Sequence, residues 1–204
     1  GSYGAQGVGV IRCVAIQPDN SNRVIAGSMN AGLWLTTDKG ATWQLMGKDV
    51  PLVETVYGIK FAPGNTNIVY AITNAGLIKS TDAGVTWSYT TNFLSGLPYV
   101  AVETMLEVSP TDNSKVFVCV KNNNATNGGL YVTTNGGSSW TTLQSGKAYW
   151  DIKLHPANEN VIYAIEQTPS PNWWCKFVKS TDGGSTITTV NNGYPSTNIS
   201  GRQL

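Results

Sequence analysis

The chain has 204 residues, of which only 12% are charged, and its formal net charge at neutral pH is +1. It is not basic enough to follow a phosphate backbone, so we expect no nucleic-acid partner. No apolar stretch approaches the roughly 18 residues of a membrane span, so we expect no membrane insertion either. Seven Trp, nine Tyr and many turn-forming residues are typical of all-β secreted proteins.

A proline-centred motif recurs four times along the chain, at Pro18, Pro63, Pro110 and Pro156, with spacings of 45, 47 and 46 residues. Each proline lies in a polar turn between two short apolar strands, A and B, and two further short strands, C and D, follow. In the first repeat we expect these strands at 12–17, 24–28, 33–37 and 43–46. Four short strands in each unit of about 46 residues predict the blade of a β-propeller.

The predicted fold is therefore all-β, with four blades of four antiparallel strands in one propeller segment over residues 1–204. The expected blades cover 8–47, 53–91, 100–144 and 148–191, and residues 192–204 resemble the start of another blade. An open arc of four blades would leave edge strands and one apolar blade face uncovered. We therefore expect the segment to belong to a larger ring within a longer chain, with a closed four-bladed ring as the alternative.

A second motif marks the turn between strands C and D of every repeat: TTDKGATW, STDAGVTW, TTNGGSSW and STDGGSTI. An Asp or Asn in such a turn can accept hydrogen bonds from its own backbone, and the following Gly allows a positive φ angle. The Trp that follows can pack between neighbouring hairpins, although Ile187 replaces it in the last repeat. The residues concerned are Asp38, Gly40, Trp43, Asp82, Gly84, Trp87, Asn135, Gly137, Trp140, Asp182 and Gly184.

These repeated acids are interpreted as structural rather than as catalytic or metal-binding. A catalytic or metal-binding acid is needed at one site, whereas this acid recurs in almost every blade. The feature that every blade shares is the C–D turn, so the acid is expected to stabilise that turn. We accordingly expect no catalytic residue, no metal site and no cofactor in this chain. His155 is the only histidine, and the matching positions of the other repeats are Gln17, Ala62 and Ser109, so no cluster of metal ligands is expected there. The three cysteines are expected to be buried or partly buried thiols, with a Cys119–Cys175 bridge as the alternative.

The turn motif resembles the Asp-box, or BNR, repeat of β-propellers, and the strands resemble those of sortilin-like repeat proteins of bacterial surfaces. More closely, GVGVIRCVAIQPDNSNRVIAGSMNAGLW followed by TTDKGATW is similar to the propeller region of large secreted bacterial proteins. Such proteins commonly carry a sorting domain for type IX secretion. The resemblance covers nearly the whole chain, and it implies an extracellular or cell-surface location and more than four blades.

Asp-box propellers also include glycoside hydrolases, so an enzyme is the alternative function. Sialidases need an arginine cluster, and the chain has only Arg12, Arg23 and Arg202. Xyloglucanase-like enzymes use paired aspartates, one of which follows strand B. Asn30 and Asn74 occupy the comparable places in this chain, and an amide cannot act as a general acid or base. Asp151 with Glu103 or Glu107 is the carboxylate pairing that remains to be checked.

The leading function is therefore non-catalytic recognition of a polysaccharide or a surface protein, or scaffolding of neighbouring domains. Exposed indoles with amide and carboxylate neighbours form a platform on which sugar rings can stack. The D–A loop before the fourth blade and the B–C loop within it bring such residues together. The predicted platform is Tyr149, Trp150, Asp151, Asn172, Trp173 and Trp174, with Asn122–Asn124, Tyr57 and Tyr99 as extensions. The alternative is that Trp150 and one of the paired tryptophans fill the space between blades.

Overall fold

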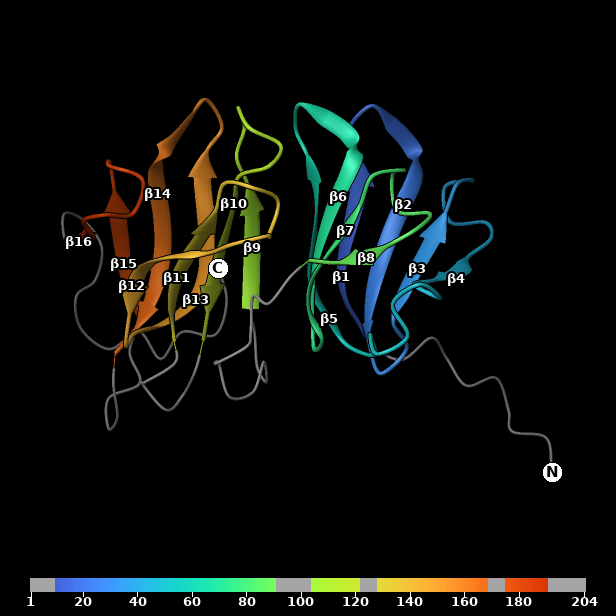
Figure 1. The fold of residues 1–204 in the computed structure, drawn as a ribbon, viewed down its shortest axis with the longest axis horizontal. Coiled ribbons are helices and arrows are strands. Elements are labelled where there is room, and N and C mark those ends of the chain that lie inside the picture. Colours follow the sequence, from blue (N-terminus) through green and yellow to red (C-terminus); the bar gives the residue numbers. More distant parts are fainter. Residues whose placement is uncertain (1–9, 91–103, 122–127, 169–174, 191–204) are drawn as a thin grey trace.

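The computed structural model describes residues 10–90, 104–121, 128–168 and 175–190. These residues form strands and turns without any helix, arranged as four separate four-stranded antiparallel sheets (Figure 1). In the described part there is consequently no helix that could cross a membrane. The predicted fold class, an all-β chain of four propeller blades, is confirmed.

Each sheet contains four strands that are consecutive in the chain. Blade 1 consists of β1 (Val10–Gln17), β2 (Asn20–Met29), β3 (Leu33–Thr36) and β4 (Gln44–Met46). Blade 2 consists of β5 (Val56–Ala62), β6 (Asn65–Thr73), β7 (Gly76–Ser80) and β8 (Ser88–Tyr89). Blade 3 consists of β9 (Thr104–Val108), β10 (Val116–Val120), β11 (Gly129–Thr133) and β12 (Thr141–Ser145). Blade 4 consists of β13 (Ala148–His155), β14 (Asn158–Gln167), β15 (Cys175–Ser180) and β16 (Thr188–Thr189).

The second strand of blade 1 starts four residues earlier than expected. Asn20 already pairs with Gln17, so the turn around Pro18 is a tight two-residue connection rather than a longer polar loop. The same pairing recurs in blade 2, between Ala62 and Asn65, and in blade 4. A proline fits this corner because it needs no backbone N–H in the ladder.

Within the described residues, the first strand contains a bulge in blades 1, 2 and 4. The register shifts between Ile11 and Cys13, between Val56 and Gly58, and between Tyr149 and Asp151. A bulge adds one residue to one strand and changes which way the neighbouring side chains point. In blade 4 the additional residue is Trp150, and this decides where the predicted platform residues lie.

The hydrophobic core is divided into three clusters, each of which lies between two neighbouring blades. Ile25 and Leu35 of blade 1 pack with Ile59 and Phe61 of blade 2 in the first cluster. The second cluster joins blades 2 and 3, and the third joins blades 3 and 4. We call the side of a blade that looks toward the preceding blade its upstream face, and the opposite side its downstream face. Each blade is thus held mainly by the faces of its neighbours.

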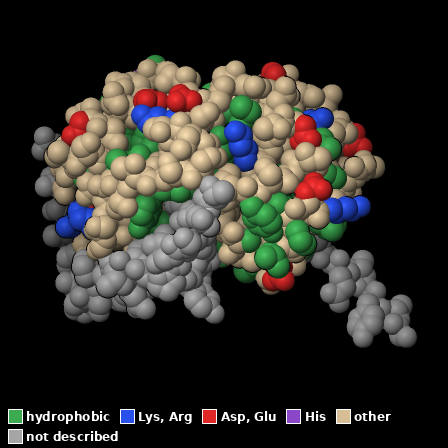
Figure 2. All heavy atoms as spheres, viewed as in Figure 1, with side chains coloured by type: hydrophobic (Ala, Val, Ile, Leu, Met, Phe, Trp, Pro, Cys, Tyr) green, Lys and Arg blue, Asp and Glu red, His purple; other side chains and the backbone are tan. Residues whose placement is uncertain are grey.

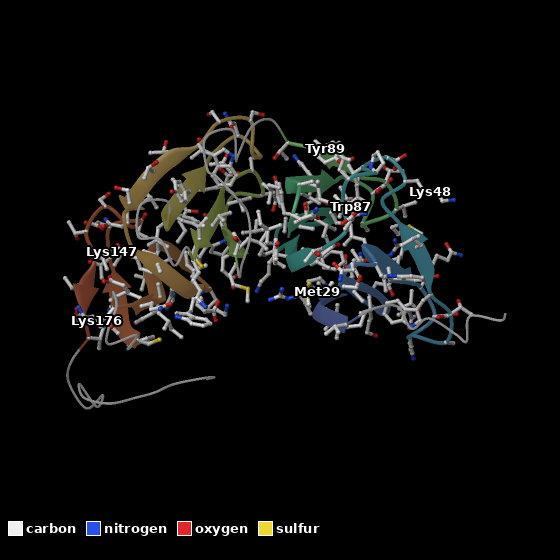
Figure 3. The ribbon with its side chains drawn as sticks, turned by 90° about the horizontal axis from the view of Figure 1, so that it is seen from below. Met29, Lys48, Trp87, Tyr89, Lys147 and Lys176 are labelled. Atoms are coloured by element: carbon white, nitrogen blue, oxygen red, sulfur yellow. The ribbon has the colours of Figure 1, made fainter. Side chains whose placement is uncertain are left out.

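The four blades form an open arc whose two end blades curve toward the same side (Figure 3). The upstream face of blade 1 therefore meets no other described blade. Trp87 of blade 2 is buried between blades 1 and 2, with 3% of its surface exposed, whereas Trp43, at the same place in blade 1, is 40% exposed. The expectation that Trp43 packs between two neighbouring hairpins is therefore corrected. A blade on the upstream side of blade 1 would be needed to cover the indole, and no such blade is among those described.

The three cysteines are free thiols. Cys119 is completely buried in the cluster between blades 3 and 4, and burial raises its pKa to about 12. Cys13 lies between blades 1 and 2, where burial raises its pKa to about 11. The thiols are thus buried or half-buried, as expected. The alternative, a bridge between Cys119 and Cys175, is not formed.

Candidate functional site

The acidic residues of the C–D turns are bound to their own hairpins. The carboxylate of Asp38 accepts hydrogen bonds from the backbone N–H of Thr42, at 2.9 Å, and from its hydroxyl, at 2.6 Å. The hydroxyl of Thr36 donates to the same carboxylate and accepts from the N–H of Gly40, whose φ is 92°. Asp82 and Asp182 make the same set of bonds within their own turns.

The third turn carries a neutral version of this arrangement. The amide oxygen of Asn135 accepts from the N–H of Ser139, and its amide nitrogen donates to the Ser139 hydroxyl. In the charged turns, hydrogen bonds from Thr42 and Thr36 lower the pKa of Asp38 from 3.8 to about 2, and those from Thr186 and Ser180 lower that of Asp182 to about 2. These groups are therefore held ionised as acceptors inside the turns.

A chain of charges runs across the innermost strands of blades 2, 3 and 4. One oxygen of Glu107 accepts hydrogen bonds from Lys60, at 2.9 Å, and from Lys153, at 3.0 Å. The Lys153 ammonium also binds Asp151, at 2.8 Å. Burial lowers the pKa of Lys153, but the hydrogen bonds and charges of these two carboxylates outweigh it, so the pKa is raised. We call Lys60, Glu107, Asp151 and Lys153 the inner ladder.

The inner ladder includes the carboxylate pairing that the sequence left to be checked. Asp151 and Glu107 do lie close together, because both bind the ammonium of Lys153. Their nearest oxygens are accordingly no more than about 6 Å apart, an upper limit that is compatible with the roughly 5–5.5 Å between the carboxyl groups of retaining glycoside hydrolases. Glu103, the other candidate partner of Asp151, lies outside the described residues.

The predicted platform does not form one exposed shelf. Tyr149 is completely buried in the cluster between blades 3 and 4, so it is not available for stacking on a sugar. Burial, and then the charge of Glu166, raise the pKa of its hydroxyl, which faces Glu166 without a well-formed hydrogen bond. The cause is the bulge, which leaves Tyr149 paired with Glu166 and directed into the core. Asp151 belongs to the inner ladder instead.

Trp150 lies under the ammonium of Lys121, which is 2.9 Å from the centre of its ring system. That face of the indole is thus already covered by a cation. Its Nε1 is buried and makes no hydrogen bond, and the same holds for the side-chain oxygen of Gln167 in the paired strand. Unpaired buried polar groups are costly, so this end of blade 4 carries hydrogen-bonding capacity that the described residues do not use.

The other predicted platform residues divide into two groups. Tyr57 is buried between blades 2 and 3, and the Arg12 guanidinium lies 5.4 Å from the centre of its ring. The remaining residues, Tyr99, Asn122–Asn124, Asn172, Trp173 and Trp174, lie outside the described residues. His155 accepts a hydrogen bond from the N–H of Ala157 through Nδ1, which places it in its own turn. Within the described ranges, no three side chains of His, Cys, Asp or Glu gather into a potential metal site.

Asn74 holds two loops together. Its amide oxygen accepts from the N–H groups of Glu54 and Thr55, each at 3.0 Å, and its amide nitrogen donates to the carbonyl of Leu52. All three partners belong to the loop between blades 1 and 2, so both ends of the amide are in use. Asn30, at the matching place in blade 1, has a positive φ of 69°, which an Asn adopts more readily than most residues.

Lys60 and Lys153, the two lysines of the inner ladder, and Lys121 were not identified from the sequence. A signal for the ladder exists: the residues three positions before each proline are Ala15, Lys60, Glu107 and Lys153, and the last three alternate in charge. Equivalent positions of neighbouring blades lie side by side in a propeller, so this alternation indicates ion pairs. Lys121 has no comparable signal, because its contact with Trp150 depends on how far the bulge displaces the indole.

Comparisons with known proteins place the chain among β-propellers. It matches no protein-family model and none of the curated proteins. Among solved structures it is similar to an ancestral GH74 enzyme, with 21% identity, a TM-score of 0.70 and coverage of 91% of this chain and 24% of that one. It is also similar to YCF48 from Cyanidioschyzon merolae, with 18% identity, a TM-score of 0.61 and coverage of 89% and 56%. YCF48 has also been solved with a D1 peptide bound.

A third similar structure is PorZ, described as an essential bacterial surface component of the type-IX secretion system of Porphyromonas gingivalis. The identity is 12%, the TM-score is 0.62, and the match covers 92% of this chain and 23% of PorZ. The chain thus spans about a quarter of the length of the GH74 enzyme and of PorZ. Identities this low establish the fold and nothing finer. Together with the four sheets, they show that the chain is a segment of a β-propeller.

Proposed function

We propose that this chain is a non-catalytic recognition module of the Asp-box propeller class, which presents a glycan-binding or protein-binding surface outside the cell. The hydrogen-bond pattern of Asp38, Asp82, Asn135 and Asp182 supports the Asp-box assignment, since the same cassette closes the same turn in each blade. Similarity to PorZ supports a surface location and a type IX secretion context. We also propose that the arc belongs to a larger ring.

The observation that carries the non-catalytic assignment is the ammonium between Asp151 and Glu107. A hydrolase needs one carboxyl to reach the glycosidic oxygen and another to reach the sugar or a water molecule. In the inner ladder, Lys153 binds both carboxylates, and Lys60 binds Glu107 as well. The carboxylate oxygens of Glu107 and Asp151 that face each other are therefore engaged in ion pairs with lysines, and these ion pairs link blades 2, 3 and 4. Both acids thus have a structural role.

The proposed binding surface is the rim of blades 3 and 4 that carries the D–A and B–C loops. Trp150, Lys121 and Gln167 lie at this end of the two sheets, and two of them have the unused polar groups described above. The sequence adds Asn172, Trp173 and Trp174 to the same rim. A ligand with hydroxyl or amide groups and an apolar face, such as a polysaccharide or an extended peptide, fits this combination.

The test is a glycan array, together with an array of extracellular protein fragments, probed with the complete chain. We expect binding by the wild type, loss of binding in the Trp173→Ala/Trp174→Ala double variant, and unchanged binding in Tyr89→Ala. Tyr89 is a matched control, because it is an exposed aromatic residue of blade 2. Equal binding by the wild type and the double variant, or no binding by either, would contradict the proposed surface.

A hydrolase cleft is the second candidate, favoured by the short distance between Asp151 and Glu107. It predicts release of reducing sugars from xyloglucan or a related polysaccharide, and loss of that activity in Glu107→Gln and Asp151→Asn. We expect no release by the wild-type chain. Hydrolysis that disappears in both variants would replace the recognition function by the enzymatic one.

A further inference from the structure

The neutral C–D turn of blade 3 contains a chemically labile pair of residues, Asn135 and Gly136. Asparagine is thermally labile, most of all before a glycine, because no Cβ shields the backbone nitrogen that follows from the side-chain amide. Two further asparagines that precede a glycine, Asn127 and Asn192, lie outside the described residues. The turn of blade 3 is therefore the place where the structure can be used to judge this chemistry.

The reaction of such a pair is deamidation through a cyclic imide. The backbone nitrogen of Gly136 attacks Cγ of Asn135, the bond between Cγ and the amide nitrogen breaks, and that nitrogen leaves as ammonia with the proton that Gly136 loses. Water then opens the imide. Opening at Cγ gives an aspartate with a normal main chain, whereas opening at the main-chain carbonyl gives an isoaspartate, whose main chain runs through Cβ and Cγ. Water is the co-reactant, and nothing is oxidised or reduced.

The closed turn holds the reacting atoms in other contacts. The attacking nitrogen, that of Gly136, donates its proton to the carbonyl of Ser114, at 2.8 Å. The leaving nitrogen, in the amide of Asn135, donates to the Ser139 hydroxyl, at 2.8 Å. The amide oxygen accepts from the Thr133 hydroxyl and from the N–H of Ser139, each at 2.9 Å. The imide can form only after these contacts are broken, so we expect the reaction to proceed from an opened turn.

The aspartate product fits the turn that it forms in. Asp38, Asp82 and Asp182 occupy the same position in the other blades and accept hydrogen bonds from the N–H and the hydroxyl of the residue four places later. In blade 3 that residue is Ser139, whose hydroxyl has only to rotate in order to donate instead of accept. Deamidation to aspartate would thus give blade 3 the charged turn of its neighbours.

The isoaspartate product does not fit, because its main chain is one methylene longer. The added length displaces Gly136 and Gly137, and it breaks the bond from the N–H of Gly137 to the Thr133 hydroxyl, at 2.9 Å. The turn has little room to move. A Cβ built on Gly136 would lie 3.2 Å from the Lys79 ammonium, and one built on Gly137 would lie 2.7 Å from the side chain of Thr90. Both neighbours belong to blade 2, so a displaced turn presses on the contact between blades 2 and 3.

We propose that Asn135 is a site of spontaneous deamidation whose rate is set by local opening of its own turn. The two products have opposite effects: aspartate closes the turn as in the other blades, and isoaspartate loosens the contact between blades 2 and 3. Because the reaction starts from the open turn, its rate is proportional to the fraction of molecules in which the turn is open.

The gating is tested by incubating the complete chain at neutral pH and mapping its peptides by mass spectrometry, with fragment ions that separate Asn135 from Asn127. We expect slow conversion of Asn135 in the folded wild type and fast conversion in urea. Ser139→Ala removes the partner of the leaving nitrogen and should accelerate conversion about fivefold, the factor for one lost hydrogen bond. Thr86→Ala is the matched control and should leave the rate unchanged, since Thr86 makes the corresponding bond to Asp82 in blade 2.

Three results of this experiment would overturn the gating. They are equal rates in the folded and unfolded chain, no conversion of Asn135 in the unfolded chain, and equal rates in Ser139→Ala and the wild type. Equal acceleration by Ser139→Ala and Thr86→Ala would overturn it too, because the reaction would then follow unfolding of the whole chain.

The opposite effects of the products are tested on separated species. Anion exchange isolates the deamidated chains, an isoaspartate-specific methyltransferase identifies the isoaspartate form, and Asn135→Asp supplies the aspartate form. In thermal unfolding at neutral pH we expect Asn135→Asp to be at least as stable as the wild type and the isoaspartate form to be less stable than both. An Asn135→Asp variant that is less stable than the wild type, or an isoaspartate form that is equally stable, would overturn this part of the proposal.

Discussion

Trp87 and Trp43 occupy the same position in successive blades, and replacing each by Ala measures what a neighbouring blade contributes. Their exposures, 3% and 40%, differ by roughly 90 Å² on a side chain of about 250 Å². At about 25 cal/mol per Å², this area corresponds to about 2 kcal/mol. Trp87 also donates from Nε1 to the carbonyl of Gly84, at 3.0 Å, and loss of that buried bond adds about 1 kcal/mol.

We therefore expect Trp87→Ala to lower the free energy of unfolding by about 4 kcal/mol, in the range seen for buried aromatic residues, and Trp43→Ala by only about 1 kcal/mol. Urea unfolding followed by far-UV circular dichroism measures both. Circular dichroism is preferred because each variant removes one of the indoles that fluorescence would report. Equal losses in the two variants would refute the view that the core lies between blades.

Three further predictions concern turns and loops. Gly84→Ala should destabilise the chain by about 1–3 kcal/mol more than Gly40→Ala in urea unfolding. Both glycines have a φ of 92°, but only at Gly84 would the new methyl group lie 2.4 Å from a core side chain of blade 1. Asp38 and Asp182 have pKa values lowered from 3.8 to about 2, so the stability they contribute is present above pH 4 and lost as the pH falls toward 2. Thermal unfolding between pH 5 and 2 should show this loss, and it should be smaller in the Asp38→Asn/Asp182→Asn variant. Asn74→Asp loses the donor to Leu52 and should cost about 1–2 kcal/mol in urea unfolding without creating hydrolysis; a gain of hydrolytic activity would contradict its structural role.

The sequence predicted the blades because the signals for strands and turns are local. A proline corner and an Asp–Gly turn act within a few residues, so Pro18 and Asp38 determine their hairpins wherever these lie in the ring. Burial is different, because it depends on the neighbouring blade. Trp43 and Trp87 have nearly the same local sequence, and only the arc shows which of them is covered.

The candidate site was less accessible from the sequence. The bulge at Trp150 reverses the side to which Tyr149 points, and one inserted residue in a strand leaves no clear pattern of its own. The inner ladder joins Lys60, Glu107 and Lys153, which are more than 40 residues apart, so it becomes visible only when the repeats are aligned. The face that Figure 2 shows agrees with the composition: its charged side chains are few, scattered and of both signs.

The positions of the thiols give two of the blade contacts a chemical reporter. A thiol reagent attacks the thiolate, and Cys13 and Cys119 have pKa values of about 11 and 12 inside separate clusters. Modification of Cys13 thus records how often blades 1 and 2 part, while Cys119 records the same event for blades 3 and 4. The two labelling rates, followed in one sample under native conditions, would show whether the contacts between blades open one at a time or all together.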